Sequence, residues 1–216
     1  MRSRFDAQLA ELNRELIEMG ALCEEVIGMA SKALLAGDLN LAASVAPLDS
    51  EIDHKEREIE SICLKLLLHQ QPVAKDLRQI SAALKMITDM ERIGDQAEDI
   101  CEIVRFLSGR SIENADLLSD MSRAVIKMVT ESVDAYVKHD IMLAEKVIAD
   151  DDTVDSAFDQ VKGELIERIA KNPNDGEYAL DLLMVAKYFE RIGDHATNIA
   201  EWVIFSVTGI HKEDEA

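Results

Sequence analysis

The sequence predicts an all-α protein, built as two tandem three-helix bundles related by internal duplication. Three observations predict this fold class. The 216 residues include only 9 Gly and 3 Pro, too few turn-forming residues for a sandwich or barrel of many short strands. Apolar residues, mostly Leu, Ile, Ala, Val and Met, recur at helical spacing. A Glu-Arg-Ile-Gly-Asp motif occurs at residues 91–95 and again at 190–194, a separation of 99 residues.

Apolar spacing predicts three helices in each half of the chain. Asp38 fits an N-cap, and Asp140 matches it in the second half. A break near Pro47 is expected because proline does not fit a helix interior, and Gly109-Arg110 ends the third helix. The short connections favour an up-down-up bundle in each of two units, residues 1–109 and 110–216. The expected helices cover about residues 9–37, 38–69, 75–108, 113–139, 140–171 and 177–210.

The two halves align with two different offsets. Upstream of the shared motif the offset is 102 residues, because Asp49 matches Asp151 and Asp53 matches Asp155. At the motif itself the offset is 99 residues. The change predicts a shorter turn before the last helix than before the third.

The charge balance excludes one class of partner. The chain has 23 Lys plus Arg against 43 Asp plus Glu, a net charge of −20. Direct nucleic-acid binding is not expected, because such proteins place cations against phosphates. Cys23, Cys63 and Cys101 form neither a disulfide framework nor a metal knuckle, so we expect small core residues in a reducing compartment. With no apolar run of 18 residues and no signal core, we expect a cytoplasmic protein.

Pairs of acids four residues apart are the candidate functional residues. Side chains at this spacing lie one turn apart on one helix face, where like charges cost on the order of 0.2–0.5 kcal/mol per pair. If the second and third helices of each unit are antiparallel neighbours, each unit gathers four carboxylates. The pairs are Asp49 with Asp53, Glu91 with Asp95, Asp151 with Asp155, and Glu190 with Asp194.

Such a patch of carboxylates is typical of a metal site. Carboxylates without cysteine and with little histidine select hard or borderline ions such as Mg, Mn, Ca or Fe, although Zn is also held this way. Several bridging carboxylates suit a cluster better than a single ion. The alternative is a solvated acidic flank, neutralised by Arg92, Arg191 and nearby lysines. The presence of acids at matched positions in both halves favours the metal.

Other residues give weaker signals. Gly94 and Gly193 lie inside predicted helices, where glycine costs roughly 1 kcal/mol relative to alanine, so we expect neighbouring helices to approach closely there. Glu51 and His54 have the Glu-x-x-His spacing of di-iron bundles, but the second half lacks it, and His54 is expected at the surface. His195 is a further, weaker ligand candidate. Without a nucleophile–base set, a phosphate loop or a dinucleotide fingerprint, no enzyme activity is expected.

Three features together match a known family. They are the segment Gln-Gln-Pro-Val-Ala-Lys-Asp-Leu-Arg at residues 70–78, the two Glu-Arg-Ile-Gly-Asp motifs, and the acid pairs within a duplicated six-helix plan. Over nearly its whole length the chain resembles the PhoU family of accessory regulators of phosphate-specific transport. The resemblance implies two multinuclear metal sites. It assigns Asp49, Asp53, Glu91, Asp95 and Asp99 to the first, and Asp151, Asp155, Glu190, Asp194 and Asn198 to the second.

The resemblance also implies how the protein works. Asn198 and Thr197 replace Asp99 and Glu98, so the second site has fewer charges and unequal occupancy is expected. The ions would be divalent or trivalent, with Fe, Zn, Mn and Mg as the choices.

Family members are expected to be cytoplasmic homodimers that act as negative regulators of the phosphate-starvation response. They would contact the phosphate-sensing histidine kinase and the ATPase subunit of the phosphate transporter, and would meet the membrane only through these partners. This makes the protein a non-catalytic adaptor. The alternative is a carboxylate-bridged metal oxidase or metal-storage bundle. The absence of ferritin-type histidines from the sequence favours the adaptor.

Overall fold

The computed structural model describes residues 2–69, 72–107, 112 and 116–210, and nearly all of them are helical. The described part of the chain contains six long helices, one short helix and one 3₁₀ turn, which confirms the predicted all-α class. They are α1 (Arg2–Ala36), α2 (Leu39–Ala43), α3 (Ala46–His69), α4 (Ala74–Phe106), α5 (Asp116–Lys138), α6 (Ile141–Lys171), the 3₁₀ turn η1 (Pro173–Asp175) and α7 (Gly176–Thr208).

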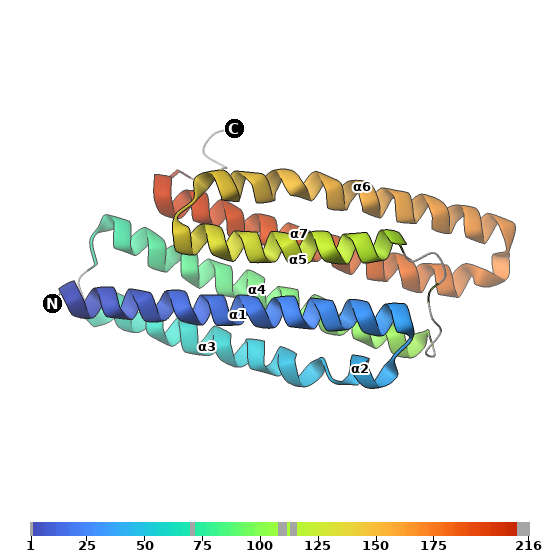
Figure 1. The fold of residues 1–216 in the computed structure, drawn as a ribbon, viewed down its shortest axis with the longest axis horizontal. Helices are drawn as coiled ribbons and strands as arrows, with labels where there is room; N and C mark the ends of the chain where they lie inside the picture. Colours follow the sequence, from blue (N-terminus) through green and yellow to red (C-terminus); the bar gives the residue numbers. More distant parts are fainter. Residues whose placement is uncertain (1, 70–71, 108–111, 113–115, 211–216) are drawn as a thin grey trace.

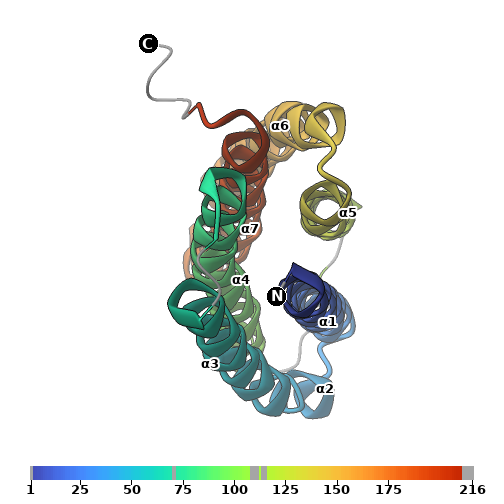
Figure 2. The same ribbon diagram turned by 90° about the vertical axis from the view of Figure 1, so that its left-hand side faces the viewer.

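The long helices form two three-helix bundles. Helices α1, α3 and α4 pack together as the first bundle, and α5, α6 and α7 as the second (Figure 1). Seen from the end, α4 lies against α7 and α1 against α5, while α3 and α6 occupy the outer edges (Figure 2). The buried apolar side chains form one cluster that runs through both bundles. The predicted pair of tandem bundles is therefore confirmed. The predicted division at residues 109 and 110 lies outside the described residues.

Equivalent turns reverse the chain in the two bundles. Gly37 (φ 66°) and His139 (φ 54°) both take the left-handed conformation that stops a helix. The next residue caps the helix that follows. Asp38 caps α2 and Asp140 caps α6, each accepting hydrogen bonds from backbone N–H groups at 3.0–3.1 Å. These turns bring α3 and α6 back along α1 and α5.

The break in the second helix of the first half lies before Pro47, not at it. Helix α2 ends at Ala43 and α3 begins at Ala46, so Pro47 is the second residue of α3. Proline fits there because a residue of the first turn needs no intrahelical partner for its N–H. The predicted helix ends at 108–110 and 113 lie outside the described residues. The prediction of a shorter turn before the last helix is wrong, because four residues separate His69 of α3 from Ala74 of α4 and four also separate Lys171 of α6 from Gly176 of α7.

Polar contacts join the two bundles within the shared core. The Ser31 hydroxyl donates to the Ser122 hydroxyl at 2.9 Å, between α1 and α5. The hydroxyl of Tyr136 donates to the backbone carbonyl of Gln79 at 2.9 Å, between α5 and α4. Burial raises the pKa of the Tyr136 phenol, so it stays a donor. These bonds fix the relative position of the bundles.

Two further expectations concern the whole chain. All three cysteines are buried and free of disulfide bonds, as expected for small core residues. No helix of the described residues has an apolar stretch long enough to cross a bilayer.

Candidate metal centres

In the first bundle, α3 and α4 bring the predicted acids to one face. Asp49 of α3 has an exposed fraction of only 8%, and its buried Oδ1 accepts no hydrogen bond from any described residue. Burial, followed by repulsion from Glu98, Asp53, Asp95 and Glu91, raises the pKa of Asp49 to about 7. The Asp49 carboxylate is therefore surrounded by negative charge and lacks a compensating donor.

The second bundle repeats this arrangement with less charge. The buried Oδ1 of Asp151 also accepts no hydrogen bond from any described residue. Burial and the charges of Asp155, Asp194 and Glu190 raise the pKa of Asp151 to about 6, and the nearby Thr197 hydroxyl opposes the rise. Thr197 stands where the first bundle has an acid. The two sites are equivalent in position but unequal in charge.

The glycine of each shared motif leaves room for the buried oxygen of the aspartate opposite, Asp49 or Asp151. A Cβ atom at Gly94 would lie 2.5 Å from Oδ1 of Asp49, closer than any non-bonded contact allows. A Cβ atom at Gly193 would lie 3.0 Å from Oδ1 of Asp151. The expected close approach is thus between a glycine backbone and a carboxylate of the neighbouring helix. A buried, unsatisfied carboxylate is costly, and its presence twice, each time beside a glycine, points to a binding role.

Cations on the same helices neutralise part of each acidic face. Within the described part of the chain, no three His, Cys, Asp or Glu side chains are placed so that they could hold a metal ion. The acids are gathered on one face, but their oxygens do not form a ligand sphere, and ion binding would require the carboxylates to turn away from these cations. The pairs are Arg92 with Asp95 at 2.9 Å and Glu91 at 3.4 Å, Arg57 with Asp53 at 3.5 Å, and Lys187 with Glu190.

Two of the residues assigned to the sites face the seam between the bundles. The Asn198 amide donates to Oδ1 of Asp89 on α4 at 3.1 Å, and Nδ1 of His195 lies 2.9 Å from the same oxygen. Asp99 lies beside the Tyr188 hydroxyl of α7, which opposes the rise that burial causes in the pKa of Asp99. The structure thus places Asp99, Asn198 and His195 in contacts that join α4 to α7.

Two acids that the assigned ligand sets leave out lie at the first site. Glu98 exerts the largest repulsion on Asp49, and it follows Glu91 by seven residues on the same stripe of α4. Glu56 follows Asp49 by seven residues on α3, and burial, with repulsion from Asp53 next, raises the pKa of Glu56. Helical spacing alone marks both residues, since positions seven apart share a face.

The di-iron pattern receives no support from the structure. His54 is an exposed residue, with 68% of its side chain accessible, and its Nε2 lies 3.3 Å from Glu58 on the same helix. The expectation that His54 is a surface residue is confirmed.

A duplicated, strongly acidic helical bundle with a buried, unsatisfied aspartate oxygen in each half defines the class of protein, and comparison with known proteins gives the family. The PhoU domain matches residues 16–104 and 118–203, one match in each bundle. A relative from Clostridium acetobutylicum, named phosphate-specific transport system accessory protein PhoU homolog, is 36% identical over 212 residues and 96% of each chain. A relative of the same name from Pseudomonas aeruginosa is 36% identical over 95% of this chain and 86% of its own.

Solved structures agree with this match. The crystal structure of PhoU from Pseudomonas aeruginosa superposes with a TM-score of 0.90 at 36% identity, covering 95% of this chain and 100% of that chain. The phosphate transport system regulatory protein PhoU from Streptococcus pneumoniae superposes with a TM-score of 0.86 at 26% identity, over 95% and 98% of the two chains. The chain belongs to the PhoU family, and the resemblance seen in its sequence is confirmed.

Proposed function

We propose that this protein is a phosphate-signalling adaptor. It restrains the phosphate-starvation response and modulates phosphate-specific ABC transport by binding the transporter's ATPase subunit and a phosphate-sensing histidine kinase. It acts without catalysis, as a cytoplasmic homodimer that meets the membrane only through these partners. Support comes from relatives that are 36% identical over nearly the whole chain and are named as phosphate-specific transport accessory proteins.

We also propose that both acidic faces bind metal ions. The observation that carries this is the buried, unsatisfied Oδ1 of Asp49 and of Asp151, each beside a motif glycine. A bound cation supplies the positive charge that these mutually repelling carboxylates lack. The ligands would be Asp49, Asp53, Glu91, Asp95 and Glu98 in the first bundle, and Asp151, Asp155, Glu190 and Asp194 in the second.

The other assigned ligands have competing partners. Asp99 lies beside the Tyr188 hydroxyl of α7, and Asn198 would have to leave Asp89. The second site has Thr197 in place of Glu98, so it attracts a cation less strongly. We therefore expect the first site to fill at lower metal concentration than the second.

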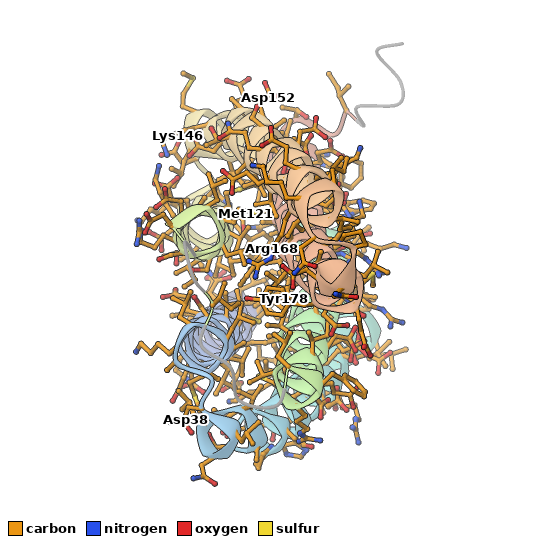
Figure 3. All side chains as sticks on the ribbon, turned by 90° about the vertical axis from the view of Figure 1, so that its right-hand side faces the viewer. Asp38, Met121, Lys146, Asp152, Arg168 and Tyr178 are labelled. Carbon is orange, nitrogen blue, oxygen red and sulfur yellow. The ribbon has the colours of Figure 1, made fainter. Side chains whose placement is uncertain are left out.

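Elemental analysis of protein purified without chelator tests the metal sites. Glu91→Ala and Glu190→Ala should each lose part of the bound metal, while circular dichroism shows that the helices survive. Asp152→Ala is a matched control, because Asp152 lies next to Asp151 on α6 but on the exposed outer surface (Figure 3). Retention of the full metal content by both variants would leave the acidic faces as solvated surface.

Binding assays test the adaptor role. The purified protein should retain the ATPase subunit and the kinase in a pull-down, and chelation should weaken that retention. Binding to neither partner would contradict the proposal. Oxygen consumption with ferrous iron, followed on an oxygen electrode, would instead indicate a metal oxidase.

A further inference from the structure

Four apolar side chains, here called the apolar patch, lie exposed at the end of the first bundle where α3 leads into α4. Leu64 and Leu68 are 47% and 78% exposed near the end of α3, and Val73 and Leu77 are 56% and 44% exposed at the start of α4. Each pair has the i, i+4 spacing that puts both side chains on one helix face. Contiguous exposed apolar surface marks interaction sites, whereas apolar residues exposed singly do not.

Helix packing places the two pairs side by side. Ile52 of α3 lies against Gly94 of α4. Because the two helices are antiparallel neighbours, Leu68 comes level with the first turn of α4, which holds Leu77. Figure 2 looks onto this end of the molecule, where α3 and α4 lie next to each other. The four side chains therefore form one surface.

The apolar patch lies on the same face of the bundle as the first acidic site. Leu64 follows Asp53 by 11 residues on α3, and Leu77 precedes Glu91 by 14 residues on α4. These intervals are close to three and four whole helical turns, so each leucine lies on the stripe of its helix that carries an acid, about 16 to 21 Å away. A molecule that covers the patch also approaches the acids.

The charge closest to the apolar patch is negative and uncompensated. Glu60, one turn before Leu64 on the same stripe, is exposed and forms no ion pair with any described residue. The cations close in sequence face other elements: α1 for Lys65, the α5–α6 turn for Lys75, and α7 for Arg78. The patch therefore favours an occupant whose apolar side chains are flanked by a basic residue.

The corresponding positions of the second bundle are not apolar in this way. At the offsets of 102 and 99 residues, Leu68 and Leu77 correspond to Ala170 and Gly176. The patch is thus a property of the first bundle, although both bundles have an acidic face. Two of its residues belong to the segment at residues 70–78 that helped to indicate the family and that contributes to neither acidic face.

We propose that the apolar patch binds a partner protein through apolar side chains, with a basic residue of the partner meeting Glu60. Charge argues for this occupant over two others. A second copy of this chain placed face to face here would bring two acidic faces together, and an anionic bilayer repels a chain with a net charge of −20. This inference deepens the adaptor proposal, on which it rests for the existence of a partner.

Two purified proteins are the probes: the transporter's ATPase subunit and the cytoplasmic part of the phosphate-sensing kinase. Surface plasmon resonance with the full-length protein should show saturable binding of at least one of them. Leu68→Ser combined with Leu77→Ser should weaken that binding by at least about tenfold, because it removes two exposed apolar anchors. Ile166→Ser is the matched control and should bind as the wild type does, since Ile166 is 60% exposed and stands in the second bundle where Leu64 stands in the first.

The outcomes distinguish a failure of the patch from a failure of the adaptor. Equal binding by the wild type and the double variant, or equal weakening by Ile166→Ser, would overturn the patch and leave the adaptor standing. Binding of neither protein by the wild type would overturn both proposals. The double variant should keep its full metal content, since its two leucines lie outside the acidic site.

Glu60→Lys tests the charge contact without altering the apolar residues. It should slow association with the partner severalfold and reduce the dependence of the association rate on salt. Asp152→Lys makes the same change of charge on the exposed surface of the second bundle and should have a smaller effect. Equal association rates for the two variants would show that no basic group meets Glu60 and would overturn this part of the proposal.

Two measurements test the other occupants. Light scattering that shows self-association lost in the double variant, but kept in Ile166→Ser, would overturn the partner protein in favour of a second copy. Cosedimentation with vesicles of phosphatidylglycerol and phosphatidylethanolamine that is lost in the double variant would overturn it in favour of a membrane. Unchanged self-association and no binding to vesicles support the proposal.

Discussion

Substituting the motif glycine gives the sharpest test of the first site. A Cβ atom at Gly94 would lie 2.5 Å from Oδ1 of Asp49 and 3.1 Å from Cδ1 of Ile52. The aspartate would have to rotate, and Ile52 on the same helix would be crowded as well. At Gly193 the nearest atom, Oδ1 of Asp151, would lie 3.0 Å away. At Gly163, inside α6, a Cβ atom meets nothing within 4 Å.

These distances set the expected order of stabilities. Alanine in place of a helical glycine is favoured by about 1 kcal/mol, so Gly163→Ala should stabilise the protein by about 0.5–1 kcal/mol. Overpacking a filled site costs about 1–3 kcal/mol, which should exceed the helix gain at Gly94 and roughly cancel it at Gly193. Gly94→Ala should therefore lower the free energy of unfolding by up to about 2 kcal/mol, and Gly193→Ala should change it little.

Urea denaturation followed by circular dichroism, in the presence of EDTA, measures the three free energies. Adding Asp49→Ala to Gly94→Ala should remove the clash, so the double-mutant cycle should give a favourable coupling of about 1 kcal/mol or more. If Gly94→Ala stabilises the protein as much as Gly163→Ala does, the aspartate does not occupy the space beside the glycine, and the reasoning about the site fails.

Three further predictions follow from the same structure. In EDTA, Asp49→Ala should raise the free energy of unfolding by about 1–2 kcal/mol because it removes a buried, unsatisfied carboxylate. Asp53→Ala removes a half-buried carboxylate that already pairs with Arg57, and should change the free energy by less than about 0.5 kcal/mol; equal effects would contradict the assignment. Tyr136→Phe removes the bond to Gln79 and should cost about 1 kcal/mol in urea unfolding; no loss would show that the bond does not join the bundles. Burial, with Lys75 next, lowers the pKa of His139, so its contribution to stability is present above about pH 6.5 and is lost as the pH falls through its folded value. His139→Asn, which tolerates the positive φ, should make acid melting curves less steep in pH, and an unchanged pH dependence would refute this.

Helix positions and the duplication could be read from the sequence because they depend on neighbouring residues. Asp38 begins the second helix because its side chain reaches N–H groups two and three residues ahead, a relation visible in sequence. The spacing of four residues is enough to place Asp49 with Asp53 on one face of α3, and Glu91 with Asp95 on one face of α4. The duplication shows that the second bundle carries matching pairs. The repeated motif identified the two halves of the chain. The motif and the duplication together indicated the family.

The side chains that meet between helices were decided by packing. Sequence could not show that Asp49 fills the space beside Gly94, that Glu98 rather than Asp99 faces Asp49, or that Asn198 turns toward Asp89 across the seam. Each of these contacts depends on how one helix is rotated and shifted against another. That arrangement is set jointly by residues that are far apart in the chain. Helical spacing fixes only which residues share a face. What that face meets is a property of the packed molecule.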